Sequence, residues 1–263
     1  MKKDKSKKIK AFWDEEARKK GASLYATIPD FYLKQIEIKS ILTHVKDGNN
    51  VLDIGCGNGY SSISFAKNRK INITGVDFSS EMIKAAKEAL NKTPELKKKV
   101  NFSEGDVTKI AFDKKNNNFF DIVITERCLI NLVDFKAQIK ALNQICLTLK
   151  KRGMYLMCED TQNGLRKLNK LRTKFNLPEI KNRWHNVYIN EKLFLKKASK
   201  LFDVLAVENI SSTYYIVSRI INARIAADEK KEPDYLSPIN RIGSELPILG
   251  DFGPLKLFIF QKK

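Results

Sequence analysis

The sequence has few cysteines and no cysteine pattern. Its four cysteines, Cys56, Cys128, Cys146 and Cys158, lie far apart in a chain of 263 residues, without CxxC or Cys/His spacing. Structural zinc sites and disulfide frameworks use closely spaced or numerous cysteines, so we expect neither. Reduced thiols in a cytoplasmic protein are the simplest interpretation, and we predict no bound metal.

Long apolar runs are also missing. The opening residues MKKDKSKKIK are charged, no apolar segment follows them, and nowhere do about 18 apolar residues stand together. The sequence therefore predicts neither a signal peptide nor a membrane span. With 43% hydrophobic residues the chain can still bury a large core, and we predict a single α/β domain over residues 1–263.

Arginine is scarce although the chain is strongly basic. The 49 Lys and Arg against 30 Asp and Glu give a formal net charge of +19, yet only ten of the cations are arginines. Such a charge attracts polyanions, so nucleic acid has to be considered as a partner. The lysines are spread along the whole chain, however, and the sequence contains no zinc knuckle and no aromatic RNA-binding strand. We favour an anionic small molecule, and the sequence leaves the oligomeric state open.

Strand and helix patterns alternate along the first 160 residues. Short aliphatic runs predict strands at 51–54, 71–76, 100–103, 119–125 and 153–158. Helical patterns lie between them, at about 60–68, 79–91 and 134–150. This order predicts βαβ units and a doubly wound, mostly parallel sheet. Further along we expect helices within 165–177, 190–202 and 211–231, strands within 202–210 and 255–261, and a long Pro-rich loop at 232–254 that is functional or disordered.

The first predicted strand ends in a glycine-rich turn. In VLDIGCGNGYSSISFA, residues 51–66, Gly55, Gly57 and Gly59 follow the strand at alternate positions. Their missing Cβ atoms permit unusual φ values and let a ligand approach the backbone, at the strand end where open α/β sheets bind ligands. A dinucleotide fingerprint would read GxGxxG, whereas this turn reads GxGxG and follows Asp53. The carboxylate indicates a ligand that carries a positive group.

Two more acidic residues follow the next two strands. Asp77, in INITGVDFSSEMI, stands where a carboxylate can bind both ribose hydroxyls of a nucleoside. Asp106, in SEGDV, can accept a hydrogen bond from an exocyclic amino group such as that of adenine. NAD would also suit Asp77. Three carboxylates at strand ends without a phosphate cradle nevertheless fit a cationic nucleoside better than a dinucleotide.

These motifs resemble those of a known family. VLDIGCGNGYSS, GVDFSSEMI, GDV and FDIVITERCLINL are similar to the successive motifs of class I S-adenosylmethionine-dependent methyltransferases, over roughly residues 50–160. The resemblance implies the seven-stranded, Rossmann-like, mostly parallel sheet of that family, with S-adenosylmethionine as cofactor and S-adenosylhomocysteine as product. Residues 50–160 would form the cofactor-binding core. An N-terminal helical lid would occupy 1–49, and acceptor-side insertions with the last strands would occupy 161–263.

The resemblance also implies roles for single residues. The residues around the methionine part of the cofactor would be Asp53, Gly55, Gly57 and Gly59. The ribose hydroxyls would contact Asp77, beside Phe78 and Met82, and the adenine would lie between Asp106 and Val107. The floor near the sulfonium would consist of Glu126, Arg127 and Cys128. The N-terminal segment resembles a lid and adds Tyr25 to the cofactor site, although a helix packed on the sheet would explain it equally well.

The acceptor site has to be predicted from other residues. Methyl transfer is an in-line displacement, so the enzyme positions the acceptor and removes its proton if there is one. We expect His44 to be structural, whereas His185 in NRWHNVYINE follows the fifth strand and is our candidate base. Arg127 could bind a phosphate or carboxylate bidentately. The predicted acceptor-binding residues are Arg127, Asn131, Trp184, His185, Tyr188, Tyr214, Tyr215 and Arg219; the Tyr/Arg face could also be an ordinary solvated stripe.

A looser resemblance concerns the acceptor. ERCLINL, WHN with a nearby tyrosine, STYYIVSR and LPILGDFGPLKLF resemble a group of methyltransferases associated with bacterial surface-polysaccharide gene clusters. This resemblance implies O-methylation of an anionic capsule or lipopolysaccharide precursor, at a sugar hydroxyl or at a phosphate-type substituent such as a phosphoramidate. The alternatives are an RNA or protein methyltransferase, N-methylation of a small amine, and a non-catalytic cofactor-binding protein. RNA base N-methyltransferases often carry an NPPY-like tetrad where this chain has ERCLINL.

Overall fold

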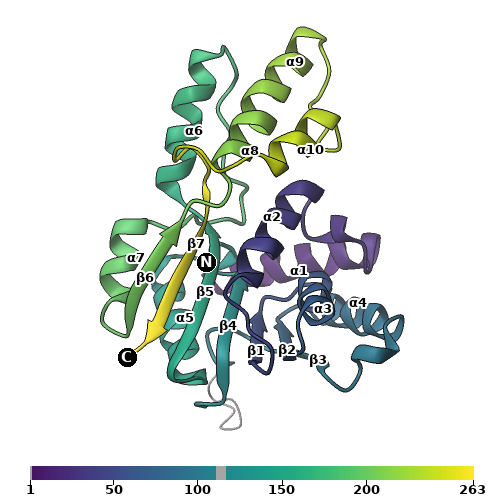
Figure 1. Ribbon diagram of the computed structural model, residues 1–263, viewed down its shortest axis with the longest axis vertical. Coiled ribbons are helices and arrows are strands. Elements are labelled where there is room, and N and C mark those ends of the chain that lie inside the picture. Colours follow the sequence, from purple (N-terminus) through teal and green to yellow (C-terminus); the bar gives the residue numbers. More distant parts are fainter. Residues whose placement is uncertain (1, 111–116) are drawn as a thin grey trace.

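A seven-stranded sheet forms the centre of the computed structural model, which describes residues 2–110 and 117–263 (Figure 1). The strands are β1 Asn50–Ile54, β2 Asn72–Asp77, β3 Val100–Glu104, β4 Phe120–Glu126, β5 Leu149–Asp160, β6 Phe202–Glu208 and β7 Leu255–Lys262. Their order is β3-β2-β1-β4-β5-β7-β6. β7 runs antiparallel to both neighbours, and the other pairs are parallel. The predicted doubly wound, mostly parallel sheet is confirmed.

Helices precede, connect and follow these strands. They are α1 Lys2–Lys20, α2 Phe31–Leu42, α3 Tyr60–Asn68, α4 Ser80–Asn91, α5 Phe135–Thr148, α6 Gln162–Lys174, α7 Glu191–Ala198, α8 Ser212–Ile216, α9 Asn222–Asp228 and α10 Pro238–Glu245. Short 3-10 turns are η1 Leu24–Ala26, η2 Pro94–Leu96 and η5 Leu129–Asn131. The helix predicted over 211–231 is interrupted by the π-helical turn η6, Val217–Ile221. No helix in the described part of the chain is both long and apolar enough to cross a lipid bilayer.

Alternate residues of the strands bury the two faces of the sheet. Val51 of β1 and Ile122 of β4 pack in one core with α2, α3 and α4. Leu52 and Val123, their neighbours in the sequence, pack in the other core with α5 and α7. A strand that is buried on both faces reads as a continuous aliphatic run, which explains why the central strands were recognisable from the sequence.

Side-chain caps fix the points where several helices begin. Asp30 accepts a hydrogen bond from Leu33 N, 3.0 Å away, at the start of α2, and Ser79 accepts one from Met82 N at the start of α4. Asp134 caps α5 in the same way. Caps of this kind satisfy backbone N–H groups that lack a partner within the helix.

The C-terminal insertions form a layer beyond the carboxyl ends of the parallel strands. Figure 1 shows α6 and α8 to α10 there, at the top of the view. The Pro-rich stretch 232–254 is ordered and includes α10. Its backbone is tied to α8, because Ser212 donates to Leu249 O and Thr213 accepts from Leu249 N. This layer closes the region where the parallel strands end.

Candidate functional site

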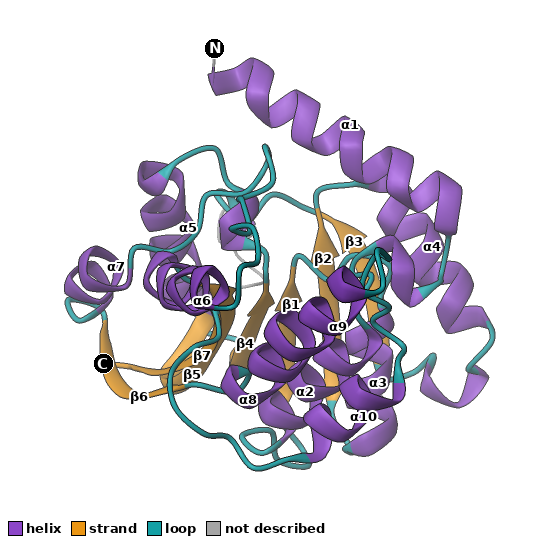
Figure 2. Ribbon diagram, turned by 90° about the horizontal axis from the view of Figure 1, so that it is seen from above, coloured by secondary structure: helices purple, strands orange, loops and turns teal. Residues whose placement is uncertain are grey.

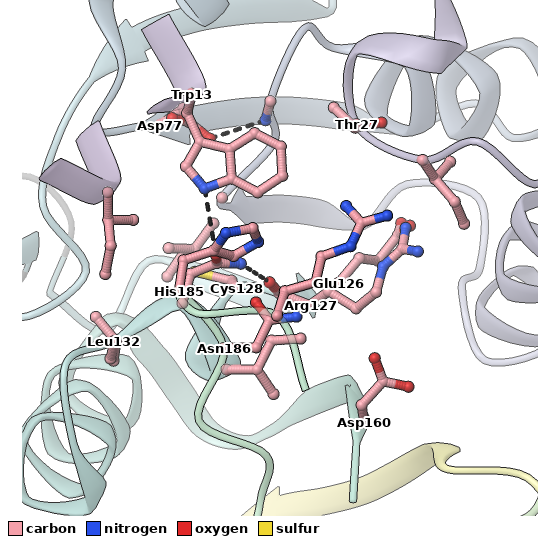
Figure 3. A pocket seen from close by; sticks show the side chains of 18 of the residues that line it. Trp13, Thr27, Asp77, Glu126, Arg127, Cys128, Leu132, Asp160, His185 and Asn186 are labelled. Atoms are coloured by element: carbon pink, nitrogen blue, oxygen red, sulfur yellow. Dashed lines mark hydrogen bonds between the residues drawn. The ribbon is translucent and has the colours of Figure 1, made fainter. Parts of the chain in front are cut away.

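A cavity of about 1050 Å³ lies at the carboxyl ends of the parallel strands. Its wall combines α1, the glycine turn, the ends of β2, β4 and β5, the loop before α7, and η6 (Figure 3). Pockets for a single small ligand usually measure about 300–1,000 Å³. The cavity is therefore large enough for a nucleoside-sized molecule and a second, smaller one.

The glycine turn has left-handed backbone at all three glycines. The φ angles are +75° at Gly55, +53° at Gly57 and +77° at Gly59. A Cβ atom on Gly55 would lie 2.7 Å from the Cβ of Cys128, and one on Gly57 would lie 2.9 Å from Thr27. Gly55 and Gly57 line the cavity, as expected, whereas Gly59 does not. At Gly59 the missing side chain makes room for the Phe102 ring of β3.

Asp77 joins the glycine turn to the end of β2. Its Oδ2 accepts a hydrogen bond from Gly57 N and its Oδ1 accepts one from Ser79 N, both at 2.9 Å. Burial raises the pKa of Asp77 to about 6, against the effect of these two donors. Each carboxylate oxygen keeps a second lone pair, so Asp77 can still accept hydrogen bonds from a ligand in the cavity. Phe78 and Met82 line the wall beside it.

Asp106 and Val107 form the adjoining edge of the cavity. The Oδ1 atom of Asp106 accepts hydrogen bonds from the backbone N and the hydroxyl of Thr108, both at 2.8 Å. Val107 is buried, whereas Asp106 is largely exposed. Both residues line the same cavity as Asp77, with Asp106 more open to water, and their contact with adenine stays a prediction.

Buried charges form the floor of the cavity. The Nζ atom of Lys34 pairs with Glu126 and lies 2.8 Å from Glu37 Oε2. Ser61 also donates to Glu126, at 3.0 Å. Burial alone would lower the pKa of Lys34, but the two carboxylates raise it, and Lys34 in turn lowers the pKa of Glu126 against burial. Lys34 and Glu126 are therefore charged at neutral pH, and Glu126 Oε1 is left without a partner.

Asp53 lies at the cofactor side of this floor. It is buried, lines the cavity and accepts a hydrogen bond from Ser62. Burial, and next to it the charge of Glu126, raises the pKa of Asp53 to about 7. A nearby positive group would favour its ionised form, so this carboxyl suits a cationic ligand.

Arg127 follows β4 in an unusual backbone conformation, with φ at +51°. The turn is held by Glu159, whose side chain accepts hydrogen bonds from the backbone N of Cys128, Leu129 and Ile130. Such φ values are uncommon in residues other than glycine and recur at functional sites. The guanidinium lines the cavity but lies 3.1 Å from Glu37 Oε2. Its predicted binding of a phosphate or carboxylate stays a prediction, and the ion pair with Glu37 takes up part of its donor capacity.

Arg219 is the second arginine of the interior. Its Nη2 lies 2.7 Å from Asp30 Oδ2, and its guanidinium lies 4.2 Å from the ring centroid of Tyr235 and 5.2 Å from that of Tyr215. Nη1 is buried without a partner. Tyr215, Arg219 and Tyr235 line the cavity, whereas the predicted Tyr214 is buried behind it and donates to Asp30 at 2.6 Å. The π-helical turn η6, a feature frequent at functional sites, carries Arg219.

His185 is buried under α1. Its ring centroid lies 4.6 Å from that of Phe12 and 5.6 Å from that of Trp13. Burial, with a smaller effect of Arg183 and Lys5, lowers the pKa of His185 to about 4. The ring lines the cavity as predicted, but it is neutral at pH 7 and a weaker base than an ordinary histidine. Figure 3 shows it between Trp13 and Asn186.

Helix α1 lies along the side of the cavity, packed on α4 (Figure 2). The indole Nε1 of Trp13 donates to Asn131 Oδ1 at 3.2 Å, and Asn131 Nδ2 donates to Arg127 O at 2.7 Å. Lys10 donates to Phe78 O at 2.6 Å. The helix therefore touches both the predicted cofactor residues and the predicted acceptor residue Asn131.

Two predicted residues point away from the cavity. The Tyr25 side chain is 41% exposed in the turn η1, and Trp184 is 54% exposed although its neighbour His185 is buried. Neither lines the cavity. Beside Trp184, His185 lines the cavity, whereas the neighbours of Tyr25, Leu24 and Ala26, are buried elsewhere in the core.

The cations at the mouth differ from those of the interior. Lys7, Lys140, Lys181 and Arg183 line the cavity. Among the described residues none of these four forms an ion pair, whereas Lys34, Arg127 and Arg219 are each paired with a carboxylate. The mouth therefore presents the uncompensated positive charge.

The sequence did not identify four residues that line the cavity, namely Asp30, Lys34, Asp160 and Tyr235, or the buried Glu37 that pairs with Lys34 and Arg127. The sequence of α2 could have indicated the buried charges, because Lys34 and Glu37 share one side of FYLKQIEIKSIL with the aliphatic residues Leu33, Ile38 and Ile41. Charged residues among buried aliphatic ones are rarely accidental. Tyr235 lies in the Pro-rich stretch and carried no comparable signal.

The four cysteines are free thiols. Burial raises the pKa of Cys56, Cys128 and Cys158 well above the ordinary thiol value, which leaves them protonated and unreactive. In residues 2–110 and 117–263, His, Cys, Asp and Glu side chains form no group of three or more suited to a metal ion.

Comparison with known proteins gives matches over the same part of the chain. Residues 45–204 match the model of a methyltransferase domain family. The chain is 35% identical over 125 residues to an uncharacterized methyltransferase of Schizosaccharomyces pombe, covering 46% of this chain and 42% of the relative. It is 31% identical over 139 residues to demethylmenaquinone methyltransferase of Staphylococcus aureus, covering 51% and 54%. The matched region thus spans about half the length of these relatives.

A solved structure shares the fold over most of its length. Magnesium protoporphyrin IX methyltransferase from Synechocystis, solved with bound SAH, superposes with a TM-score of 0.56 at 14% identity. The match covers 88% of this chain and 84% of that one. At this level of identity the likeness concerns the fold alone.

Proposed function

The chain belongs to the methyltransferase domain family, and we propose that it transfers a methyl group from S-adenosylmethionine to a hydroxyl oxygen of a small anionic molecule. The observation that carries the proposal is the division of one cavity into two parts. The glycine turn and Asp77 form one part, and beyond Glu126 the buried polar groups of α2, β5 and η6 form the other. S-adenosylmethionine supplies the methyl group in this proposal.

The residues of the first part fit that cofactor. Gly55 and Gly57 leave the backbone open, and Asp77 retains lone pairs for two ribose hydroxyls. The unpartnered Oε1 of Glu126 can accept a hydrogen bond from the amino group of the methionine part. Phe78, Met82 and Val107 supply apolar contacts for the nucleoside.

The second part supports a small acceptor. Trp13 and His185 lie over it and restrict the space in which a macromolecule would have to fit. The unpaired cations at the mouth favour an acceptor whose anionic group remains near the entrance. A phosphate- or phosphoramidate-bearing precursor of a bacterial capsule or surface glycan satisfies these requirements, and the sequence resemblance to enzymes of such gene clusters supports it.

N-methylation of a small amine is the second candidate. The buried carboxylate of Asp160 lines the acceptor part, and its Oδ1 has no partner. An ammonium group would be attracted to it. An RNA acceptor is supported only by the net charge of +19.

The proposal is tested with the full chain and S-[methyl-³H]adenosylmethionine. We expect the chain to bind S-adenosylhomocysteine in calorimetry and to transfer tritium to sn-glycerol 3-phosphate in preference to phosphoethanolamine or an RNA oligonucleotide. Labelling of RNA that falls steeply with added salt would contradict the small-molecule acceptor. Failure to bind S-adenosylhomocysteine would contradict the cofactor.

A further inference from the structure

We propose that Asp160 is a catalytic residue that accepts the proton of the acceptor hydroxyl, while Arg219 binds a second oxygen of the same acceptor. The acceptor would then be a diol or hydroxy acid rather than a monohydric alcohol. This inference rests on the proposed function, and it concerns residues to which sequence reasoning gave no proton-accepting role.

Asp160 and Arg219 each have an unused polar atom. Asp160 is 7% exposed, lines the cavity and has no hydrogen-bond partner for Oδ1. Nη1 of Arg219, also on the cavity wall, is buried without a partner. Buried polar atoms are normally hydrogen-bonded. A carboxylate acceptor and a guanidinium donor that both lack partners therefore indicate a ligand that can donate one hydrogen bond and accept another. An ammonium group could satisfy only the carboxylate.

The backbone holds Asp160 in place. Asp160 pairs with Leu255 of β7 in the sheet, and its backbone carbonyl accepts a hydrogen bond from Ile189 N at 2.9 Å. The Tyr188 hydroxyl lies close enough to the Asp160 carboxyl group to lower the pKa of Asp160. The carboxyl group is thus held at the cavity wall, and its buried Oδ1 has no hydrogen-bond partner.

The strand register places Asp160 beyond the floor. Glu126 at the end of β4 lies opposite Cys158 of β5, and Asp160 follows two residues later on the same face of the sheet. At about 3.3 Å per residue, this puts it roughly 7 Å further along the strand direction. Figure 3 shows Asp160 set apart from Glu126 within the same pocket, and in our proposal this is the acceptor side.

The surroundings make Asp160 a better base than an ordinary aspartate. Burial raises its pKa to about 6, Arg127 and Arg219 oppose the shift, and Glu37 adds to it. The other groups that face it are the hydroxyls of Tyr188 and Tyr215. It is ionised at neutral pH yet basic enough to accept a proton, whereas His185, with its pKa near 4, is less basic.

The proposed methyl transfer is an in-line displacement. The hydroxyl oxygen forms a bond to the methyl carbon, the carbon–sulfur bond breaks with its electron pair remaining on sulfur, and the hydroxyl proton passes to the Asp160 carboxylate. The carboxyl group then returns this proton to solvent when the product leaves. Arg219 fixes the second acceptor oxygen, which orients the reacting hydroxyl.

The test uses the full chain, sn-glycerol 3-phosphate as probe, and the variants Asp160→Asn and Asp160→Glu. In the unmodified chain, kcat/KM should rise about tenfold per pH unit below pH 6 and level off above it. Asp160→Asn should lower kcat by roughly 100-fold or more and abolish the rise of kcat/KM with pH. Asp160→Glu should restore part of the kcat and part of this pH dependence. Affinity for S-adenosylhomocysteine, and for the probe in its presence, should change less than about threefold by calorimetry. Asp203→Asn, on the exposed strand β6, is the matched control.

The outcomes separate the two proposals. If Asp160→Asn methylates the probe with the rate and pH profile of the unmodified chain, Asp160 is not the proton acceptor, while the proposed function stands. A loss of S-adenosylhomocysteine binding in Asp160→Asn would mean a structural role and would also overturn the inference. If the unmodified chain binds S-adenosylhomocysteine but methylates only phosphoethanolamine, or neither probe, the proposed acceptor class is wrong.

Discussion

The two parts of the cavity are built over very different sequence distances. In the cofactor part, Asp77 accepts hydrogen bonds from the backbone of Ser79, two residues away, and of Gly57, 20 residues away. In the acceptor part, Lys34 pairs with Glu126 across 92 residues and Arg219 pairs with Asp30 across 189. The first part depends on contacts within the β1-α3-β2 unit, whereas the second exists only when elements distant in the sequence have packed together.

Helix α2 connects these distant elements. Its N-cap Asp30 and its residue Glu37 supply the carboxylates for Arg219 and Arg127, and Lys34 of the same helix pairs with Glu126. A change in α2 should therefore disturb the acceptor part while the glycine turn keeps its own hydrogen bonds. The two parts of the cavity should be separable by mutation.

The largest effect is expected from Asp30→Ala. This change leaves Arg219 buried without its carboxylate and removes the cap of α2, which should lower the free energy of unfolding by about 3–5 kcal/mol. Tyr214→Phe removes only one hydrogen bond to Asp30 and should cost about 1 kcal/mol. Denaturant unfolding of both variants measures the difference. Equal losses would contradict the role of Asp30 as partner of a buried charge.

A smaller effect is expected in the cofactor part. Asp77→Ala should weaken S-adenosylhomocysteine binding at least tenfold, or about 1.4 kcal/mol, because the ribose hydroxyls lose their acceptor. Asp106→Ala should weaken it less, since Asp106 is more exposed. Calorimetry at constant pH provides both values. An unchanged affinity in Asp77→Ala would contradict the ribose role.

The pH dependence should also distinguish ligands. The pKa values of Asp77 and Asp53, raised to about 6 and about 7, mean that both carboxyls ionise as the pH rises through this range. Affinity for the cationic S-adenosylmethionine should then increase severalfold between pH 5 and 8, and affinity for neutral-sulfur S-adenosylhomocysteine should change less. The effect of pH on stability without ligand has the opposite sign. The folded state holds these protons more tightly than the unfolded state, so the free energy of unfolding falls as the pH rises from about 4 to 7. If parallel titrations show the same slope for both ligands, the ionisation of Asp53 and Asp77 does not respond to the charge of the sulfonium.

The smallest effect concerns Tyr25. Because this exposed side chain does not line the cavity, Tyr25→Phe should leave S-adenosylhomocysteine affinity within about twofold of the unmodified chain. Trp13→Phe removes the hydrogen bond to Asn131 inside the cavity and should have the larger effect. A greater loss in Tyr25→Phe would mean that the turn η1 rearranges around the cofactor.

The sequence predicted the sheet and most of the residues that line the cavity around the glycine turn, because both rest on short-range patterns. Aliphatic runs buried on both faces identified β1 and β4, and glycine spacing identified the turn. The acceptor part was predicted only in fragments. Arg127, His185 and Arg219 were placed near the acceptor, yet the carboxylates that pair with both arginines belong to α2, and the sequence could not show which distant helix would lie against them.

The direction in which single side chains point could not be predicted from the sequence either. Tyr214 and Tyr215 are adjacent, but only Tyr215 lines the cavity. Likewise His185 lines the cavity and its neighbour Trp184 does not. The π-helical turn shifts Arg219 relative to a regular helix, and no residue pattern announces such a turn. These details depend on tertiary packing, which overrides local periodicity.

A crystal structure of the full chain with S-adenosylhomocysteine tests the two-part cavity most directly. We predict that the ribose hydroxyls lie on Asp77, that the sulfur faces Glu126 and Cys128, and that Asp160 and Arg219 remain uncovered beyond it. If S-adenosylhomocysteine instead covers Asp160, or binds outside this cavity, the division into a cofactor part and an acceptor part is contradicted.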